Sequence, residues 1–465
     1  MEAFFGETRM LCGTVLDRFV SNTPATIMVR GLMERALPAE QLDLLFDNTA
    51  ETQYTRELLF SSVVNLMIGV TTRMYPSVHS AYQQDQTIEV STACLYEKIA
   101  KTETAVSEAL VRHTAEKLGP VLRQLGATRA PLIAGYKTKL IDGNHLGRSE
   151  RRLKELRDVA AGPLPGQTLV VLEPEIMLAT DVFCCEDGHA QERSMLDRVL
   201  ARVKAGDLWI ADRNFCTTKF LFELAKRDAC FIIRQHASTL RWQKESKNRR
   251  LGRIDTGVVY ERTLWLENED GKERKVRQVT LVLDEPTRDG ETQIQLITNL
   301  PPGINGKAIA KAYRKRWTIE HLFLNVTTIL NCELKTLPYP KAELFGFCCA
   351  LVAANVLATV KGALGAVHGM ETVDEQVSDY HLAMDVRVKY AGMMVAVPAE
   401  EWNFLKEMTD SAFVRWLQKM AVKVDLKRYQ KKPRGPKKPR PRRTRFAKSK
   451  HIATARLLAE ERGKK

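Results

Sequence analysis

The first 130 residues carry apolar side chains at helical spacing. Leu95, Ile99, Val106 and Leu110, for example, recur at steps of four or seven. Residues separated by three, four or seven positions share one face of a helix. No strand-like alternation of apolar and polar residues stands out in this part of the chain. We therefore expect a helical N-terminal domain over residues 1–130.

From residue 131 the pattern changes to short apolar runs, which are typical of strands. We predict strands at 137–142, 168–172, 176–183, 208–212 and 230–234, and helices at 193–205 and 219–227. The second and third strands are expected to pair across the turn at 173–175. Three consecutive strands, a helix, a strand, a helix and a strand predict a mixed α/β sheet. Functional sites of such sheets lie at the carboxyl ends of strands.

The remaining chain predicts a β-rich insertion at 236–298, followed by helical segments. The insertion shows strand patterns at 258–266, 276–283 and 293–298, and helices are expected at 308–331, 342–366 and 399–424. The apolar stretch 344–360 contains Asn355 and is short for a membrane span, so it predicts a buried core helix. We expect a core at 131–235 and 299–370, a helical C-terminal region at 371–426 and a tail at 427–465.

Composition and charge add a candidate partner. The 465 residues are 44% hydrophobic and 27% charged, as in globular proteins with a sizeable core. The net charge of +15 favours a polyanion, nucleic acid before a membrane. Thirteen Lys or Arg and no acids lie between Lys427 and Lys450. We expect this tail to be disordered on its own and to contact DNA, with a merely solvated extension as the alternative.

The nine cysteines form no C-x-x-C pairs. Together with an N-terminus that lacks the positive and apolar regions of a signal peptide, they indicate free thiols in a reducing cytosol. We therefore expect a cytoplasmic protein.

Three acids carry the candidate chemistry. Asp142 and Asp212 each end a predicted strand, and Glu320 shares one face of a predicted helix with Tyr313 and Arg316, at steps of three and four. Each aspartate alone is more often a turn or helix cap. In the order strand-Asp, strand-Asp, helix-Glu, the acids suit Mg²⁺ or Mn²⁺. Two such ions, ~3.5–4 Å apart, catalyse phosphoryl transfer, so the order predicts metal-assisted phosphodiester cleavage.

This order resembles that of DDE transposases, whose catalytic domain has an RNase H-like α/β fold. More narrowly, the chain looks like the bacterial insertion-sequence transposases with the motif Y-x2-R-x3-E-x6-K, the insertion-sequence-four group. Tyr313, Arg316 and Glu320 match three positions of that motif, and the segments 141–143 and 211–215 look like the family's two aspartate motifs. The β-rich insertion is also a family trait. The chain departs from the motif at Thr327, where the family has lysine.

The resemblance implies roles for these residues. Asp142, Asp212 and Glu320 would be the catalytic residues and hold two Mg²⁺ or Mn²⁺ ions, and Tyr313 and Arg316 would contact the DNA backbone near the scissile phosphate. The partners would be double-stranded DNA, as terminal inverted repeats and as target, and a second copy of the chain in the DNA complex. The protein would be bacterial and associated with the nucleoid when bound to DNA.

The resemblance also suggests roles for two larger parts of the chain. The N-terminal domain would recognise DNA ends or serve packing or dimerisation, two alternatives of equal weight. The helix at 399–424 is one candidate dimer interface.

Other candidates have two interpretations each. Trp317 either stacks on an unpaired base or packs in the core. Arg148 belongs to a basic cluster with Arg151 and Arg152, suited to phosphate or simply solvated. His145 is expected to be a capping or surface residue rather than part of a metal site. The polar run from Asp181 to Glu192 is expected to be a solvated loop and helix start rather than a metal cluster.

Two other functions remain open at this point. One is a metal-dependent RNase H-like nuclease without strand transfer. The other is a catalytically inactive, transposase-derived DNA-binding protein. The threonine at position 327 supports this alternative, because a hydroxyl brings no charge to a phosphate.

Overall fold

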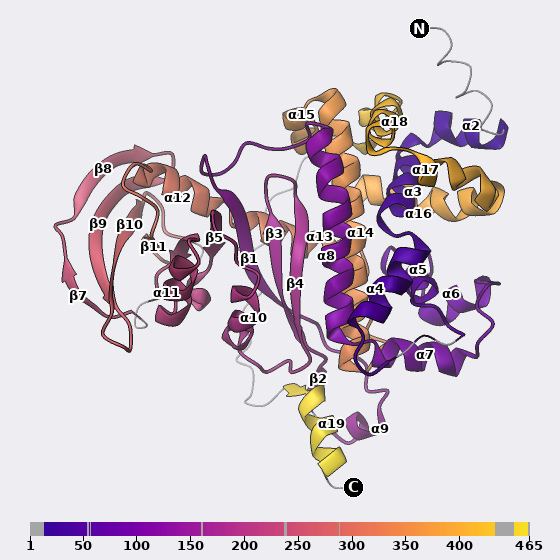
Figure 1. The fold of residues 1–465 in the computed structure, drawn as a ribbon, viewed down its shortest axis with the longest axis horizontal. Coiled ribbons are helices and arrows are strands. Elements are labelled where there is room, and N and C mark those ends of the chain that lie inside the picture. Colours follow the sequence, from indigo (N-terminus) through magenta and orange to yellow (C-terminus); the bar gives the residue numbers. More distant parts are fainter. Residues whose placement is uncertain are drawn as a thin grey trace.

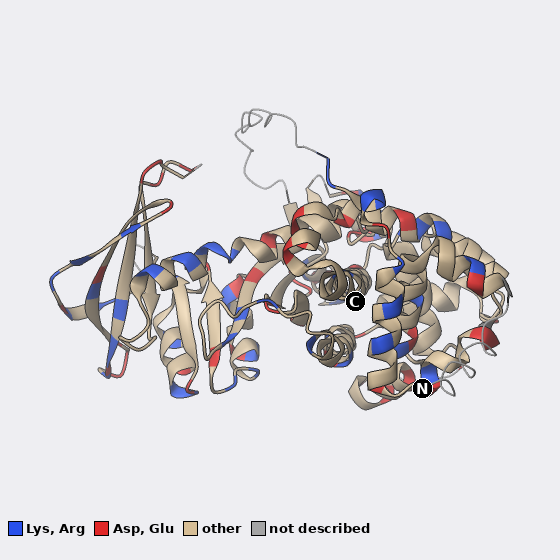
Figure 2. Cartoon of the chain, turned by 90° about the horizontal axis from the view of Figure 1, so that it is seen from above, with Lys and Arg blue, Asp and Glu red and all other residues tan. Residues whose placement is uncertain are grey.

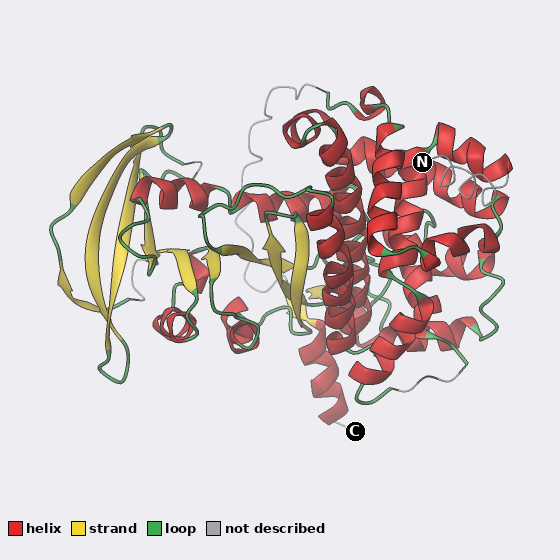
Figure 3. Cartoon of the chain, turned by 45° about the horizontal axis from the view of Figure 1, so that its top comes forward, coloured by secondary structure: helices red, strands yellow, loops and turns green. Residues whose placement is uncertain are grey.

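The protein is elongated, with its strands at one end and most of its helices at the other (Figures 1 and 3). The computed structural model describes residues 14–53, 55, 57–159, 161–236, 240–287, 289–432 and 451–463. Two long helices, α8 and α14, stand side by side between the sheet and the helical end in Figure 1.

The N-terminal part is helical, as expected. Its helices are α2 (Thr14–Asn22), α3 (Pro24–Ala36), α4 (Ala39–Thr49), α5 (Phe60–Thr71), α6 (Val78–Gln84), α7 (Thr92–Lys101) and α8 (Thr104–Gln124). Ser77 and Ser91 start α6 and α7 by accepting hydrogen bonds from backbone N–H groups of the first turn, a common N-cap device. α3, α4 and β4 pack against α8.

A mixed sheet forms the core, which confirms the predicted α/β class. Its strands β1 (Lys137–His145), β3 (Gln167–Glu173), β4 (Leu178–Cys185), β5 (Asp207–Ala211) and β6 (Cys230–Arg234) lie in the order β4-β3-β1-β5-β6. β3 is antiparallel to both β1 and β4, which confirms the predicted pairing of the second and third strands. β5 is parallel to β1 and to β6. A 3₁₀ turn η1 (Glu192–Met195) with α10 (Leu196–Leu200) precedes β5, and η2 (Arg213–Phe215) with α11 (Thr218–Lys226) follows it.

Two predicted boundaries in this core were wrong. β1 does not end at Asp142 but continues to His145, because its last residues keep pairing with β3 down to Gln167. Asp142 therefore lies inside β1, level with the end of β5. The helix predicted at 193–205 ends at Leu200.

The β-rich insertion continues the same sheet. It contains β7 (Trp242–Glu245), β8 (Arg249–Ile254), β9 (Gly257–Glu267), β10 (Glu273–Leu283) and β11 (Gln293–Thr298). β11 pairs with β6, so the order extends to β6-β11-β10-β9-β7, with β8 on the remaining part of β9. The insertion is thus joined to the core strands by backbone hydrogen bonds.

The single helix predicted at 308–331 is two helices, α12 (Gly306–Arg314) and α13 (Trp317–Thr328). At the junction, Arg316 N–H donates to the Tyr313 carbonyl and Ile319 N–H to that of Arg316. These bonds span three residues, as in a 3₁₀ turn, which is tighter than the α-helix. Tyr313 therefore lies in the last turn of α12, Arg316 lies at the junction and Glu320 lies in the first turn of α13.

The helix α14 (Pro340–His368) is the centre of the core. Among the described helices it is the one long and apolar enough to span a membrane, and 89% of its most apolar stretch is buried inside the protein. It packs on α8, α5, α3 and β4, as the prediction of a buried core helix requires. The thiols of Cys184 and Cys348 meet between β4 and α14, with 3.7 Å between sulfurs, and the described cysteines are free.

The C-terminal region is helical but more interrupted than expected. It comprises α15 (Met370–Gln376), α16 (Asp379–Ala396), η3 (Ala399–Trp402), α17 (Asn403–Glu407), α18 (Asp410–Val422) and η4 (Leu426–Tyr429). The predicted helix at 399–424 is broken because Thr409 leaves the helical conformation and caps α18 with its side chain. Lysine and arginine lie among acids in both the strand-rich and the helical ends of the described ribbon (Figure 2).

The expectation of a disordered tail was wrong for its last part, and residues 433–450 lie outside the described residues. β12 (His451–Ala453) pairs in parallel with β2 (Gly162–Leu164), and α19 (Thr454–Gly463) packs on α9 (Lys154–Arg157). Arg456 forms an ion pair of 2.6 Å with Asp187. These backbone bonds and contacts hold the C-terminus against the loop after β1.

Candidate active site

Asp142 in β1 and Asp212, directly after β5, lie next to each other. β1 and β5 run in parallel, and their last paired residues are Ile141 and Ala211, one position before the two aspartates. Neighbouring strands are ~4.8 Å apart, so the two acids share one edge of the sheet. The Asp212 carboxylate accepts a hydrogen bond from Arg213 N–H and thereby starts η2.

Arg316 links two of the three predicted acids. Its Nη1 lies 2.7 Å from Oδ2 of Asp142, and its Nη2 lies 2.6 Å from Oε1 of Glu320. The residue is 8% exposed, and its Nε has no hydrogen-bond partner in the described residues. Burial works against its charge, but Tyr313 and the surrounding carboxylates raise the pKa of Arg316 above its usual value. The junction between α12 and α13 thus places a fixed cation among the acids.

The Asp142 carboxyl is mostly buried, and its charge is disfavoured. Burial raises its pKa from 3.8 to about 6. Arg316 and the Gly143 N–H, at 3.0 Å, favour the carboxylate, whereas Asp212 and Glu192 oppose it. The direction of this shift fits a carboxyl among other acids with one compensating cation.

The aromatic candidates have opposite exposures. Tyr313 is 5% exposed, and burial raises its pKa to about 12. Its DNA contact stays a prediction. Trp317 is 63% exposed, so core packing was the wrong alternative for this residue. Stacking on a base stays a prediction.

Glu192 is a fourth acid that the sequence interpretation assigned to a solvated loop. A side-chain carbon on Gly143 would collide with its Oε1, and Asn214 donates to its Oε2 over 3.3 Å. Glu192 thus touches the residue after Asp142 and the turn after Asp212. Its position at a helix start behind the third strand was the only sequence signal for this placement.

Two other acids of that polar run, Asp181 and Asp187, have partners elsewhere. Asp181 pairs with Arg112 over 3.0 Å, and Asp187 pairs with Arg456. Their partners explain why these acids do not join the site, although they are close to Glu192 in sequence.

His145 and Arg148 follow Asp142 in the sequence, at the end of β1 and in the loop after it. Arg148 Nη2 is 2.6 Å from Nε2 of His451, beside β2 and β12. His145 lines a cavity of about 370 Å³ together with Glu192 and Asn214. A phosphate contact by Arg148 stays a prediction.

Position 327, where the family motif has lysine, carries a threonine that forms a hydrogen bond within its own helix. The Thr327 hydroxyl donates to the Phe323 carbonyl over 2.7 Å. Asn325, a possible substitute, donates to Asp379 over 3.0 Å. Neither residue brings a positive charge to the site.

A divalent cation fits the chemistry of these residues after one rearrangement. Within the described ranges, no three His, Cys, Asp or Glu side chains are arranged to hold a metal ion. The reason is visible at Asp142 and Glu320, which are bound to the Arg316 guanidinium instead. Two carboxylates share a single guanidinium, Asp212 lies close to Asp142, and hard oxygen ligands suit Mg²⁺. The residues fit if the carboxylates exchange the guanidinium for the cation.

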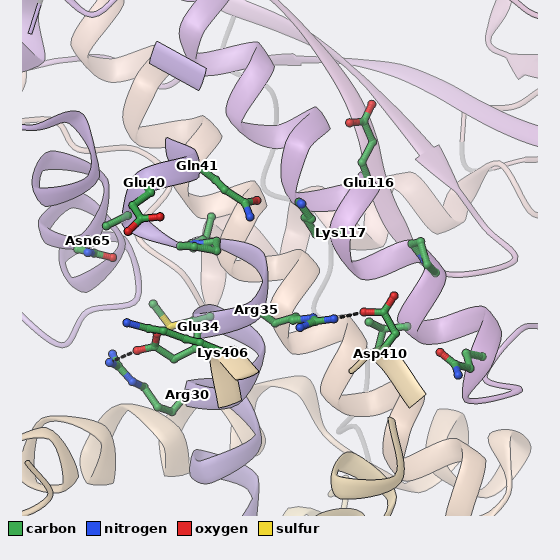
Figure 4. A pocket seen from close by; sticks show the side chains of 17 residues that line it. Arg30, Glu34, Arg35, Glu40, Gln41, Asn65, Glu116, Lys117, Lys406 and Asp410 are labelled. Atoms are coloured by element: carbon green, nitrogen blue, oxygen red, sulfur yellow. Dashed lines mark hydrogen bonds and ion pairs between the residues drawn. The ribbon is translucent and has the colours of Figure 1, made fainter. Parts of the chain in front are cut away.

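A separate cavity of about 740 Å³ lies among the helices, away from these strands (Figure 4). Residues of α3, α8 and the C-terminal helices line it, and the ion pairs Arg35–Asp410 and Arg30–Glu34 lie along it. Its lining mixes both signs of charge. It shares no residue with the carboxylate site.

Comparison with known proteins supports a function for the core. Residues 169–353 match the family described as the transposase DDE domain. The matched segment contains Glu192, Asp212 and Glu320 and begins after Asp142. None of the curated proteins matches the chain. The match covers less than half of the chain and supports a DDE transposase, an enzyme acting on DNA.

Proposed function

We propose that the protein is a DDE transposase of the insertion-sequence-four group. It would cleave DNA at the ends of its insertion sequence and join the freed 3′-hydroxyls to target DNA. The observation that carries this proposal is the position of Asp142 and Asp212 on neighbouring parallel strands, with Glu320 tied to Asp142 by one arginine. The match of residues 169–353 to the transposase DDE domain supports it.

We assign an RNase H-like fold to the core. Three antiparallel strands in a row, β1, β3 and β4, followed by β5 and β6 parallel to β1, support this assignment. The insertion after β6 and the return of the chain through α12 and α13 bring Glu320 back to β1.

The residues suit a reaction at a phosphodiester. Bound as a pair, Mg²⁺ or Mn²⁺ ions would activate a water molecule and stabilise the leaving oxygen. Asp142, Asp212 and Glu320 would hold them. Arg316 has a planar fork that binds phosphate as well as carboxylate, and its Nε lacks a partner in the described residues. We propose that a DNA phosphate binds the Arg316 guanidinium in place of Asp142 and Glu320. Both carboxylates are then free to bind the cations.

The partners follow from the same proposal. Two DNA ends must be brought together before joining, so we expect a homodimer in the DNA complex. The basic segment from Lys427 to Lys450 would add phosphate contacts. The protein would act in the bacterial cytoplasm, on the nucleoid.

The test uses labelled DNA from the two flanks of the coding region, incubated with the full chain and Mg²⁺. Wild-type protein should nick these ends and join them to a target plasmid. Glu320→Gln should bind the same DNA but not cut it. Glu375→Gln, an exposed glutamate of α15, should behave as wild type.

Each other outcome has a meaning. Cutting without joining would favour an RNase H-like nuclease. Binding without cutting would favour an inactive DNA-binding protein derived from a transposase. Wild-type cutting by Glu320→Gln would show that the site assignment is wrong.

A further inference from the structure

We propose that the basic face of α12 binds the backbone of double-stranded DNA beside the candidate active site. This face consists of four cations that lie outside the motif of Tyr313, Arg316 and Glu320, namely Lys307, Lys311, Arg314 and Lys315. The inference rests on the proposed function, because it assigns a surface of the protein to its DNA partner.

α12 has one apolar face and one basic face. Ile309 and Tyr313 are buried, and the helix packs on β8, β9 and β10. The four cations follow one another at positions i, i+4, i+7 and i+8, a spacing that places them along one side of a helix. Three of them are exposed, and the fourth, Lys307, is half-buried. The basic face is therefore the side of α12 that the sheet leaves uncovered.

The positive charge of this face is not balanced by acids. The sequence contains no Asp or Glu between Glu291 and Glu320. Arg314 pairs with Asp255 over 2.6 Å, whereas the three lysines form no ion pair in the described residues. An exposed row of unbalanced cations suits a polyanion.

The same arrangement is unfavourable for the helix itself. Like charges at positions i and i+4 destabilise a helix, and Lys311 lies four residues from both Lys307 and Lys315. Lys307 also lies in the first turn, where the helix dipole disfavours a cation. Bound phosphates would relieve both effects, so a polyanion at this face removes a cost that the free protein carries.

The strand β8 extends the basic surface. Nζ of Lys307 lies 3.8 Å from the place that a side-chain carbon would take at Gly252 of β8. β8 pairs with β9 at the edge of the sheet. Its Arg249 and Arg250 are exposed and form no ion pair within the part of the chain that the structure describes. The fold thus brings cations of two separate elements together.

The basic face ends at the candidate active site. Lys315 is followed directly by Arg316, which binds Asp142 and Glu320. At a rise of ~1.5 Å per residue, the face extends over about 12 Å. Duplex DNA carries about seven phosphates over that length, at one charge per ~1.7 Å. A duplex whose scissile phosphate reaches Arg316 can therefore also lie along α12.

The experiment measures DNA binding to the full chain by fluorescence anisotropy at several salt concentrations. Two duplexes of about 30 base pairs serve as probes, one with an insertion-sequence end and one with the same bases in scrambled order. Lysine binds phosphate as a point charge, and phosphate contacts carry no sequence information. The double variant Lys307→Gln/Lys311→Gln should therefore weaken binding to both duplexes by a similar factor.

The salt dependence gives the expected size of the effect. The slope of log affinity against log salt should become less steep by ~1.8 in the double glutamine variant, which is ~0.9 for each of two lost phosphate contacts. Lys307→Arg/Lys311→Arg keeps both charges and should bind as wild type does.

The matched control removes the same charge from α11. Lys219 and Lys226 are exposed on this helix. α11 packs in the apolar cluster that contains Phe231 and Ile233 of β6, whereas α12 packs in the cluster that contains Ile232. Successive strand residues point to opposite faces, so the two helices lie on opposite sides of the sheet (Figures 1 and 3). Lys219→Gln/Lys226→Gln should keep the affinity and the salt slope of wild type.

Two further readouts separate DNA contact from a structural role. Without DNA, Lys307→Gln/Lys311→Gln should unfold at the same temperature as wild type or higher, because it removes repulsion along α12. In the wild type, bound DNA should protect Lys307 and Lys311 from acetylation, measured by mass spectrometry. Lys219 and Lys226 should be acetylated equally with and without DNA.

The outcomes distinguish the two proposals. If Lys307→Gln/Lys311→Gln keeps the affinity and salt slope of wild type while Glu320→Gln abolishes cutting, the inference is overturned and the proposed function stands. If the glutamine variant unfolds at a lower temperature and the arginine variant does not restore binding, the two lysines are structural and the inference is likewise overturned. If the glutamine variant loses binding as expected but wild-type protein never cuts DNA, the surface stands and the transposase proposal fails. If wild-type protein binds neither duplex, both proposals are overturned.

Discussion

At the scale of single residues, Arg316 determines which carboxylates of the site are paired in the absence of a ligand. One guanidinium is shared by Asp142 and Glu320, whereas Asp212 and Glu192 form no ion pair with a lysine or arginine in the described residues. Such an internal cation keeps the acids close together in the absence of a ligand. It also competes with a divalent cation for the same oxygens, so we expect DNA and cation to strengthen each other's binding.

The raised pKa of Asp142 predicts a pH-dependent cost to stability. Its pKa is about 6 in the folded protein and near 3.8 otherwise. The folded state therefore holds the proton more tightly, and stability falls as the pH rises from about 4 to above 6. One pKa unit corresponds to ~1.4 kcal/mol, so the cost is about 3 kcal/mol at pH 8.

Asp142→Asn should remove this cost. Its free energy of unfolding, measured with urea in the absence of metal, should exceed that of wild type at pH 8 and equal it at pH 4. Asp158→Asn, in the loop after α9, is the control. A difference between Asp142→Asn and wild type that does not change with pH would contradict the buried-carboxyl account.

At the scale of elements, short apolar runs predicted eight of the described strands and missed the short or more polar β2, β7, β8 and β12. Short apolar runs bounded by turns predicted the core strands β1, β3, β4, β5 and β6 along the sequence. They also predicted the pairing of β3 with β4. The pattern does not show where pairing stops, so β1 was predicted three residues too short. The sequence also predicted one continuous helix with Tyr313, Arg316 and Glu320 on one face. The 3₁₀ junction at Arg316 has the same apolar pattern as a continuous helix, so the pattern does not reveal the break.

The candidate site was predictable only in part. Asp142, Asp212 and Glu320 were predicted because each belongs to a recognisable motif or strand end, and their catalytic role stays a prediction. Glu192 has no motif, and its contact with Gly143 arises from the packing of η1 against the sheet. Long-range contacts of this kind, like the bridge from Arg316 to Asp142, depend on tertiary structure rather than local pattern.

The first turn of α14 carries a second buried carboxyl, Glu343. It is 0% exposed, and neither oxygen has a hydrogen-bond partner in the described residues. Burial first, and then Glu333, raise its pKa well above the usual value. The folded state therefore keeps the proton on Glu343 to a higher pH than the unfolded state does. Stability should fall as the pH rises above about 4.5.

Glu343→Gln keeps the shape of this side chain and cannot ionise. We expect its thermal unfolding midpoint to exceed that of wild type at pH 8 and to match it at pH 4, measured by circular dichroism. Glu371→Gln, exposed on α15, should change neither value. Parallel pH profiles of Glu343→Gln and wild type would argue against a neutral buried Glu343.

At the scale of the whole molecule, the positive charge is concentrated in one segment. Thirteen of the cations lie between Lys427 and Lys450, and the rest of the chain is nearly neutral. The segment connects η4 with β12, and β12 is bound to β2 beyond the end of β1. We expect this basic segment to add phosphate contacts in a DNA complex.

Replacing the six cations between Lys437 and Arg445 by glutamine tests this role. DNA binding should weaken, and the slope of log affinity against log salt should become less steep by ~0.9 for each phosphate that is no longer neutralised. Fluorescence anisotropy with a duplex of about 30 base pairs at several salt concentrations measures both. An unchanged slope would show that the segment is only a solvated extension.

We propose that Asp142 and Asp212 bind catalytic divalent cations directly. The most direct test changes each in turn to cysteine and measures cleavage of labelled insertion-sequence ends in Mg²⁺ and in Mn²⁺. Thiolate is a poor ligand for Mg²⁺ and a better one for softer cations. The account predicts that Asp142→Cys and Asp212→Cys bind DNA normally, are inactive in Mg²⁺ and regain cleavage in Mn²⁺. Wild-type cleavage by either variant in Mg²⁺ would contradict it.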